Sequence, residues 1–225
     1  MTMQRRVTTA VVFVALLGPA AAASMSAQTS LEKNWDFRVL LDDREIGYHR
    51  VRVAPGEDGA RVSVEARFDV KILFIPAFRY THEASEVWKG SCLAGLEART
   101  DRNGTRLSVS AQSADDGLSL TTADGESSQL AGCVRSFAYW DPALLQSDRL
   151  LNAQSGEYQP VELLDLGDTS LDIEGKAVDA RQYRLVVDEA EIDLWYTPDL
   201  NWLALESVTR DGRRLSYLPR MEASR

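Results

Sequence analysis

The chain has 225 residues, of which 44% are hydrophobic and 26% are charged, with 34 acidic residues against 25 basic ones. This length predicts one or two domains, and the composition excludes a disordered chain, a collagen-like chain and a small disulfide scaffold. The formal charge of −9 argues against binding to nucleic acid, whose phosphate backbone attracts basic proteins.

The first 23 residues have the pattern of an export signal. Arg5 and Arg6 precede an apolar stretch that ends at residue 17, and small residues follow at 20–24. These small residues suit signal peptidase, and the apolar stretch is shorter than the ~20 residues of a transmembrane helix. We therefore predict cleavage between residues 23 and 27, a periplasmic or secreted location, and no transmembrane span in the mature chain.

The mature chain is predicted to form a single β domain over residues 35–219, preceded by a short segment over 24–34. No linker rich in proline, glycine or serine divides these residues, and neither half shows an internal repeat. Removal of the two leader arginines leaves 34 acidic against 23 basic residues, a formal charge of −11. The oligomeric state is left open by the sequence.

Export changes the meaning of the two cysteines. Cys92 and Cys133 lie 41 positions apart, with neither the spacing of a redox motif nor that of a zinc site. Oxidising compartments favour disulfides, and a bridge closing such a loop would stabilise the fold by roughly 3–4 kcal/mol. A bridge and two separate thiols both remain open at this point.

From Trp35 onward, apolar and polar residues alternate with a period of two, and turn residues interrupt them at short intervals. Residues 62–70 are typical, because every second side chain is apolar and the others are polar or charged. This pattern predicts antiparallel strands. The expected strands are 35–41, 45–54, 60–70, 77–89, 93–100, 105–112, 117–123, 159–165, 169–174, 178–187, 191–197, 202–209 and 213–218.

The middle of the chain departs from this pattern. Asp141 is a suitable N-cap for a helix that begins at Pro142, so a short helical insert is expected over 142–147, with a loop over 150–156. About a dozen antiparallel strands must close or curl to protect their edges. We therefore predict a mainly β protein whose single twisted antiparallel sheet curls into a barrel or half-barrel.

The strand over 77–89 carries the most distinctive face. Strand alternation places Tyr80, His82, Glu86 and Trp88 on one face, most of which is aromatic or apolar. Burial there would raise the pKa of the carboxyl group and lower that of the imidazole. Four strand residues span ~13 Å, so His82 and Glu86 cannot bond directly or share one metal ion. A core role for both residues is the competing interpretation.

Further aromatic residues lie near strand ends and turns, with Trp140 and Trp195 beside tyrosines, and Trp202 nearby. Such side chains suit either the lining of a pocket for an amphiphilic ligand or an ordinary core. His49 is the second of two histidines, so a three-histidine metal site is excluded. Phosphate-binding glycine motifs are absent from the sequence, and we predict no metal and no cofactor.

Several motifs are spread over the chain from about Trp35 to Tyr217. They comprise W-D-F-R-V-L-L-D at 35–42, I-G-Y-H at 46–49, Y-x-H-x-x-x-E-x-W at 80–88, Y-W at 139–140, L-L-N-x-Q-x-G at 150–156, L-W-Y at 194–196 and Trp202. Together they resemble a domain-of-unknown-function family of small exported β-proteins of Gram-negative bacteria. The resemblance implies a periplasmic, barrel-like antiparallel sheet, distantly similar to periplasmic lipoprotein carriers. It implies no catalytic residues.

Three functional hypotheses follow. The first is a non-enzymatic periplasmic domain that binds an apolar or amphiphilic ligand, or an envelope partner, through Tyr80, His82, Glu86, Trp88, Trp140 and Trp195. The second is an envelope-associated hydrolase or isomerase in which His82 and Glu86 act as acid and base. The third is a purely structural domain whose sheet interior is filled.

Overall fold

The computed structural model describes residues 32–56, 58–72, 75–188 and 190–220, and the predicted export signal with its cleavage region lies outside these ranges. The described part of the chain consists mainly of strands and has a single 3-10 helix, η1 (Pro142–Gln146). Nothing helical in that part has the length and apolar character needed to cross a membrane. The strands are β1 (Lys33–Leu41), β2 (Arg44–Gly56), β3 (Gly59–Ile72), β4 (Ile75–Lys89), β5 (Cys92–Arg102), β6 (Thr105–Ala114), β7 (Gly117–Thr122), β8 (Ser127–Ala131), β9 (Arg149–Leu151), β10 (Tyr158–Pro160), β11 (Glu162–Ile173), β12 (Lys176–Val187), β13 (Ala190–Tyr196), β14 (Trp202–Val208) and β15 (Arg214–Pro219).

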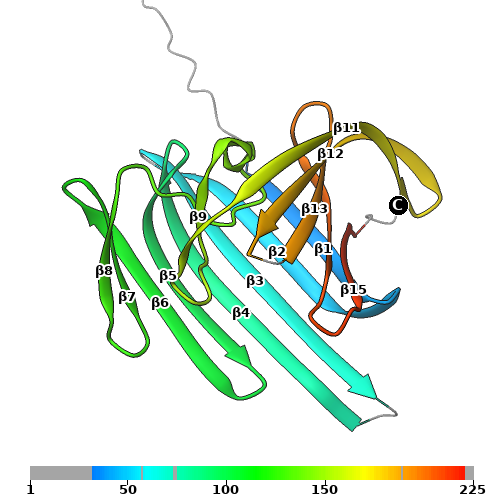
Figure 1. Cartoon of the computed structure of the whole chain (residues 1–225), viewed down its shortest axis with the longest axis horizontal. Coiled ribbons are helices and arrows are strands. Elements are labelled where there is room, and N and C mark those ends of the chain that lie inside the picture. Colours follow the sequence, from blue (N-terminus) through cyan, green and yellow to red (C-terminus); the bar gives the residue numbers. More distant parts are fainter. Residues whose placement is uncertain (1–31, 57, 73–74, 189, 221–225) are drawn as a thin grey trace, which may run out of the picture. The chain divides into compact units, whose positions relative to one another are not determined.

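Thirteen of these strands form one antiparallel sheet in the order β11-β12-β13-β14-β15-β1-β2-β3-β4-β5-β6-β7-β8 (Figure 1). Strands β9 and β10 form a separate hairpin. The sheet is curled but not closed, because β11 and β8 are its two edges. The predicted mainly β class and single antiparallel sheet are confirmed.

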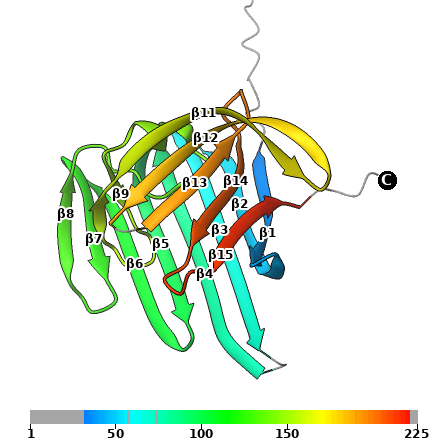
Figure 2. The same ribbon diagram turned by 45° about the vertical axis from the view of Figure 1, so that its right-hand side comes forward.

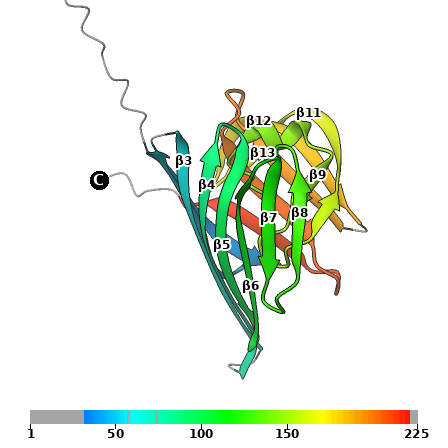
Figure 3. The same ribbon diagram turned by 90° about the vertical axis from the view of Figure 1, so that its left-hand side faces the viewer.

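The curl brings the two parts of the sheet over one another. Figures 2 and 3 show strands β11–β15 turned back across the strands β2–β6. Strand β15 pairs with β1, with Phe37 opposite Pro219 and Leu41 opposite Leu215, so the first and last strands join the two parts into one sheet. The inner face of the curl holds the main apolar core.

Alternation within the strands explains which side chains enter this core. In β4 the residues from Tyr80 to Trp88 are alternately buried and exposed, except Thr81, which is half-buried. Phe37 and Val39 of β1 are buried by the same rule. Strands such as β1 and β4 therefore contribute one apolar row to the interior and one polar row to the outer face.

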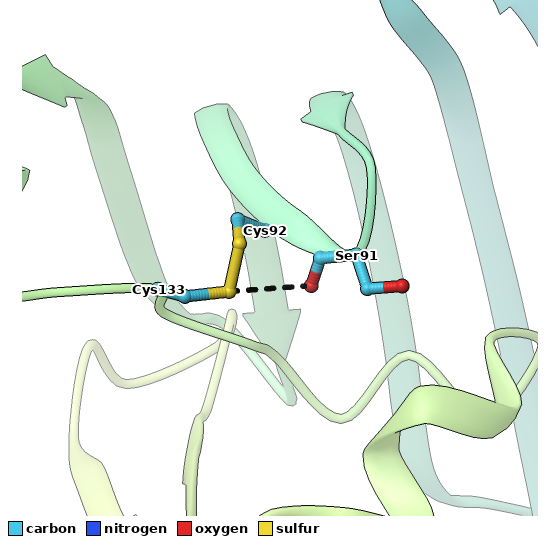
Figure 4. The surroundings of a disulfide bond; sticks show 3 residues. All are labelled: Ser91, Cys92 and Cys133. Carbon is cyan, nitrogen blue, oxygen red and sulfur yellow. Dashed lines mark hydrogen bonds between the residues drawn. A yellow bond between two sulfur atoms is a disulfide. The ribbon is translucent and has the colours of Figure 1, made fainter.

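The segment between β8 and β9 is fixed against the inner face. Cys92 and Cys133 form a disulfide with Cα atoms 5.0 Å apart, and the Leu93 amide donates to the Val134 carbonyl at 2.8 Å. Figure 4 shows Cys133 beside Ser91, whose carbonyl oxygen lies 3.8 Å from the Cys133 sulfur. The bridge thus ties the start of this segment to the start of β5.

The predicted helical insert corresponds to η1, which Asp141 caps by accepting from the Ala143 amide at 3.0 Å. Two expected strands, 159–165 and 169–174, correspond mostly to the single strand β11, which continues through a bulge between Asp165 and Gly167. Strands β8 and β9 were not expected, and β9 includes Leu150 and Leu151 of the predicted loop. Those leucines are fully buried, which favours pairing over a surface loop.

Candidate functional site

A cavity of about 1120 Å³ lies between the two parts of the curled sheet. This volume exceeds the roughly 300–1,000 Å³ of most small-molecule sites. Its walls come from β2, β3 and β4 on one side, from β14 and β15 on the other, and from residues in the segments 136–140, 152–159, 187–188 and 190–192. The cavity therefore lies where strands distant in sequence face one another.

Two histidines and a small residue form a row across the cavity wall. His49 on β2 lies opposite Ala66 on β3, and Ala66 lies opposite His82 on β4. Neighbouring strands are ~4.8 Å apart, which places the two imidazoles on the same face with roughly 10 Å between their backbones. The small Ala66 side chain leaves the space between them open to the cavity.

The two imidazoles differ in their hydrogen bonding. Nδ1 of His82 lies 2.9 Å from the Thr100 hydroxyl oxygen. Neither ring nitrogen of His49 has a hydrogen-bond partner among the described residues, although both nitrogens are buried. Burial lowers the pKa of His49 to about 3, with a smaller contribution from His82, and burial alone lowers that of His82 to about 4. Both rings are therefore neutral at neutral pH.

Aromatic side chains surround this row. The His49 ring meets those of Trp202 and Tyr217 edge-on, at centroid distances of 5.9 and 5.3 Å. Tyr80 stacks on Phe68 at 4.9 Å. Burial raises the pKa of Tyr80 and Tyr217, so these phenols stay protonated. This end of the cavity is consequently polar but uncharged.

Glu86 lines the cavity from a different row of the sheet. Its strand neighbours are Val62 on β3 and Leu96 on β5, both of them buried. The carboxyl accepts a hydrogen bond from the Trp88 indole N–H at 2.7 Å. Burial raises the pKa of Glu86 to about 7, while this hydrogen bond acts in the opposite direction. Glu86 is thus an acidic group held in an apolar wall.

The segment after the disulfide contributes residues 136–140 to the cavity wall. Trp140 lines the cavity and meets the Trp88 ring edge-on at 5.3 Å. The backbone carbonyl of Tyr139 accepts from the Tyr196 hydroxyl at 2.8 Å, which attaches this segment to β13. The disulfide and this hydrogen bond therefore attach the segment that carries Tyr139 and Trp140 to the sheet at two points.

Of the six residues predicted to form the site, the structure places Tyr80, His82, Glu86 and Trp140 in the cavity wall. Trp88 is 1% exposed and lies behind the wall, where it contacts Glu86 and Trp140. Trp195 is not part of the cavity. It alternates with the buried residues Leu194 and Tyr196 and therefore faces the other side of the sheet.

Several wall residues did not appear among the predicted site residues. His49, Tyr139, Trp202 and Tyr217 all line the cavity. The alternation of β2, which buries Val51, places His49 on the same inner face. The sequence pattern could therefore have predicted the position of His49. The approach of β15 to β1 places Tyr217 there, and no local pattern signals such a long-range pairing.

The arrangement does not bring His82 and Glu86 close enough for acid-base chemistry with each other. His82 and Glu86 are four residues apart on one strand, about 13 Å, and each already bonds to a different partner, Thr100 and Trp88 respectively. Within the ranges that the structure describes, no cluster of three or more histidine, cysteine or acidic side chains offers a metal site.

The fold and the sequence both have relatives. In structure the chain is similar to a β-barrel-like protein of the domain of unknown function DUF1849 from Brucella abortus, with a TM-score of 0.57 over 84% of this chain and 98% of that one, at 8% identity. The comparison with curated proteins gives no match. The family model of DUF6134, a domain of unknown function, matches residues 37–220. The matched region contains the curled sheet and its cavity, and the chain belongs to the DUF6134 family.

Proposed function

We propose that this protein is an exported, non-enzymatic binding domain that holds an amphiphilic small molecule in its cavity. The observation that carries this proposal is a cavity of about 1120 Å³ whose wall combines apolar and aromatic side chains with buried polar groups, such as His82 and Glu86, and with further polar side chains that are partly or fully exposed. Binding sites for small molecules have this composition, because apolar contacts provide affinity and a few polar groups fix orientation. Export is supported by the leader-like residues 1–23.

The unpartnered imidazole of His49 supports the proposal further. Buried polar atoms in proteins nearly always have a hydrogen-bond partner, and those that lack one call for an explanation. Both nitrogens of His49 are buried without a partner among the described residues, and the ring lines the cavity. A bound molecule with a hydroxyl, amide or carbonyl group would supply that partner.

The test combines recovery of a natural ligand with a variant that fills the cavity. Protein purified from the exported fraction is analysed by native mass spectrometry, and tryptophan fluorescence is followed as lipids of several classes are added. We expect a co-purifying mass and quenching, because Trp140 and Trp202 line the cavity. Absence of both would overturn the proposal.

The filling variant is Ala66→Phe, which places a ring between the two histidines. We expect it to abolish quenching, whereas Ser63→Phe on the exposed face of the same strand leaves quenching unchanged. Equal quenching in both variants would place the ligand elsewhere. A turnover that His82→Ala abolishes without changing thermal melting would favour the enzymatic alternative instead.

A further inference from the structure

We propose that the cavity recognises the ammonium group of an amphiphilic organic cation through Glu86. The inference rests on the proposed function, because it concerns the polar end of the same ligand. Glu86 is an ionisable residue with apolar neighbours on the adjacent strands. Glu86 is 6% exposed, and its neighbours in the row across the sheet from β2 to β6 are Val53, Val62, Leu96 and Ala111.

No cation within the described part of the chain neutralises this carboxyl. Glu86 forms none of the salt bridges that the structure shows. On the outer face, by contrast, acidic side chains such as Asp36 and Asp193 pair with arginines. Trp88 provides a single neutral N–H at 2.7 Å. Burying a carboxylate without a counterion is costly, and a cationic ligand group that reaches it removes that cost.

The neighbouring aromatic rings suit the same kind of group. Trp88 contacts both Glu86 and Trp140, and the ring of Trp140 lines the cavity beside Tyr139. Aromatic faces attract organic cations, most strongly where water is excluded. A buried carboxylate that bonds to Trp88 and lines the same cavity as Trp140 and Tyr139 therefore favours an ammonium group over a neutral or anionic one.

The remaining charges of the cavity point the same way. Its other ionic side chains are Asp188, Glu191 and Arg210, and Glu191 already pairs with Arg184 at 2.8 Å. An anionic head group would require basic side chains to receive it, and Arg210 is the single arginine or lysine among the described wall residues. The overall excess of acidic over basic residues also draws cations toward the protein.

The test compares amphiphiles that share one chain and differ in the head group. Dodecyltrimethylammonium, dodecyl maltoside and laurate are added separately to the full protein, below their micellar concentrations, and binding is measured by tryptophan fluorescence and calorimetry. We expect the ammonium compound to bind at least about tenfold more tightly than the neutral one, since one charged contact is worth more than ~1.4 kcal/mol. Laurate should bind most weakly.

Two variants on β4 locate the effect. Glu86→Gln keeps an acceptor for the Trp88 N–H and removes the charge, so it should lose the preference for dodecyltrimethylammonium over dodecyl maltoside. Glu83→Gln makes the same charge change on the exposed side of the strand and should retain the preference. Circular dichroism checks that each variant is folded.

The outcomes separate the two proposals. Equal affinity for all three compounds, or a preference that survives Glu86→Gln, overturns the ammonium inference and leaves the binding function standing. Tightest binding of laurate also overturns it. Failure of every compound to bind overturns the proposed function together with the inference.

Discussion

The two faces of the sheet treat ionisable side chains in opposite ways. On the outer face, charges are matched across neighbouring strands, as in Arg50 with Asp36 at 3.0 Å and Arg184 with Asp193 at 2.7 Å. On the inner face, His49, His82 and Glu86 have no ion pair, and burial moves each pKa toward the neutral form.

This difference indicates which ionisable side chains are not explained by the stability of the fold alone. Exposed ion pairs contribute little to stability, because water screens them and long side chains lose entropy. Buried polar groups are expensive, and an apolar residue of similar size would serve a core better. The inner-face groups are therefore the ones for which a ligand offers a physical reason, and the following variants test the contrast.

The largest effect is expected at the inner face, for Trp88→Ala. This change removes a buried aromatic side chain together with the only hydrogen bond to Glu86 that the structure shows, so it should lower the free energy of unfolding by ~3–5 kcal/mol. Trp195→Ala on the other face is the matched control and should cost much less. Denaturant unfolding measures both, and similar losses would contradict the distinction between the faces.

Removal of the disulfide comes next. The double variant Cys92→Ser with Cys133→Ser should lose about 3–4 kcal/mol of stability, because the unfolded chain is no longer closed into a loop. It should also weaken ligand binding, since the bridge holds the segment that carries Tyr139 and Trp140. Unchanged affinity in the folded double variant would show that the hydrogen bond from Tyr196 suffices to hold that segment.

The pH dependence of stability tests the inner face from another direction. The folded state binds a proton at Glu86 up to about pH 7, whereas the unfolded carboxyl releases it near 4.5, so the charged form destabilises the fold as the pH rises between these values. Glu86→Gln removes this loss. Its stability relative to the natural chain should rise by ~1.4 kcal/mol per pH unit, about 3 kcal/mol in total, and level off above pH 7.

Thermal or urea unfolding from pH 4 to 8 measures this difference, and Glu83→Gln serves as the exposed control. The histidines act with the opposite sign, because their folded pKa values lie below 6.5 and the unfolded state takes up protons first as the pH falls. A difference between Glu86→Gln and the natural chain that does not change with pH would mean that the carboxyl is hydrated in the folded protein.

Local sequence pattern was sufficient for the fold class and for part of the cavity wall. The period-two alternation of β4 predicts that Tyr80, His82 and Glu86 share a face, because successive strand residues point to opposite sides. The same rule separates Trp195 from Tyr196, although both are aromatic. The curl of the sheet, which brings Tyr217 and Trp202 over β2, depends on the pairing of β15 with β1 and has no local signal.

The smallest effect is expected on the outer face, at the pair Arg184 and Asp193. These residues lie opposite each other on β12 and β13, and the guanidinium meets the carboxylate through two hydrogen bonds of 2.7 and 2.9 Å. A double-mutant cycle with Arg184→Gln and Asp193→Asn should give a coupling of only ~0.5–1 kcal/mol that decreases with added salt, because both side chains are partly exposed to solvent. A coupling as large as the free energy of unfolding lost in Trp88→Ala would mean that ion pairs on the outer face also contribute strongly to stability. The contrast between the two faces would then no longer support the cavity as the functional site.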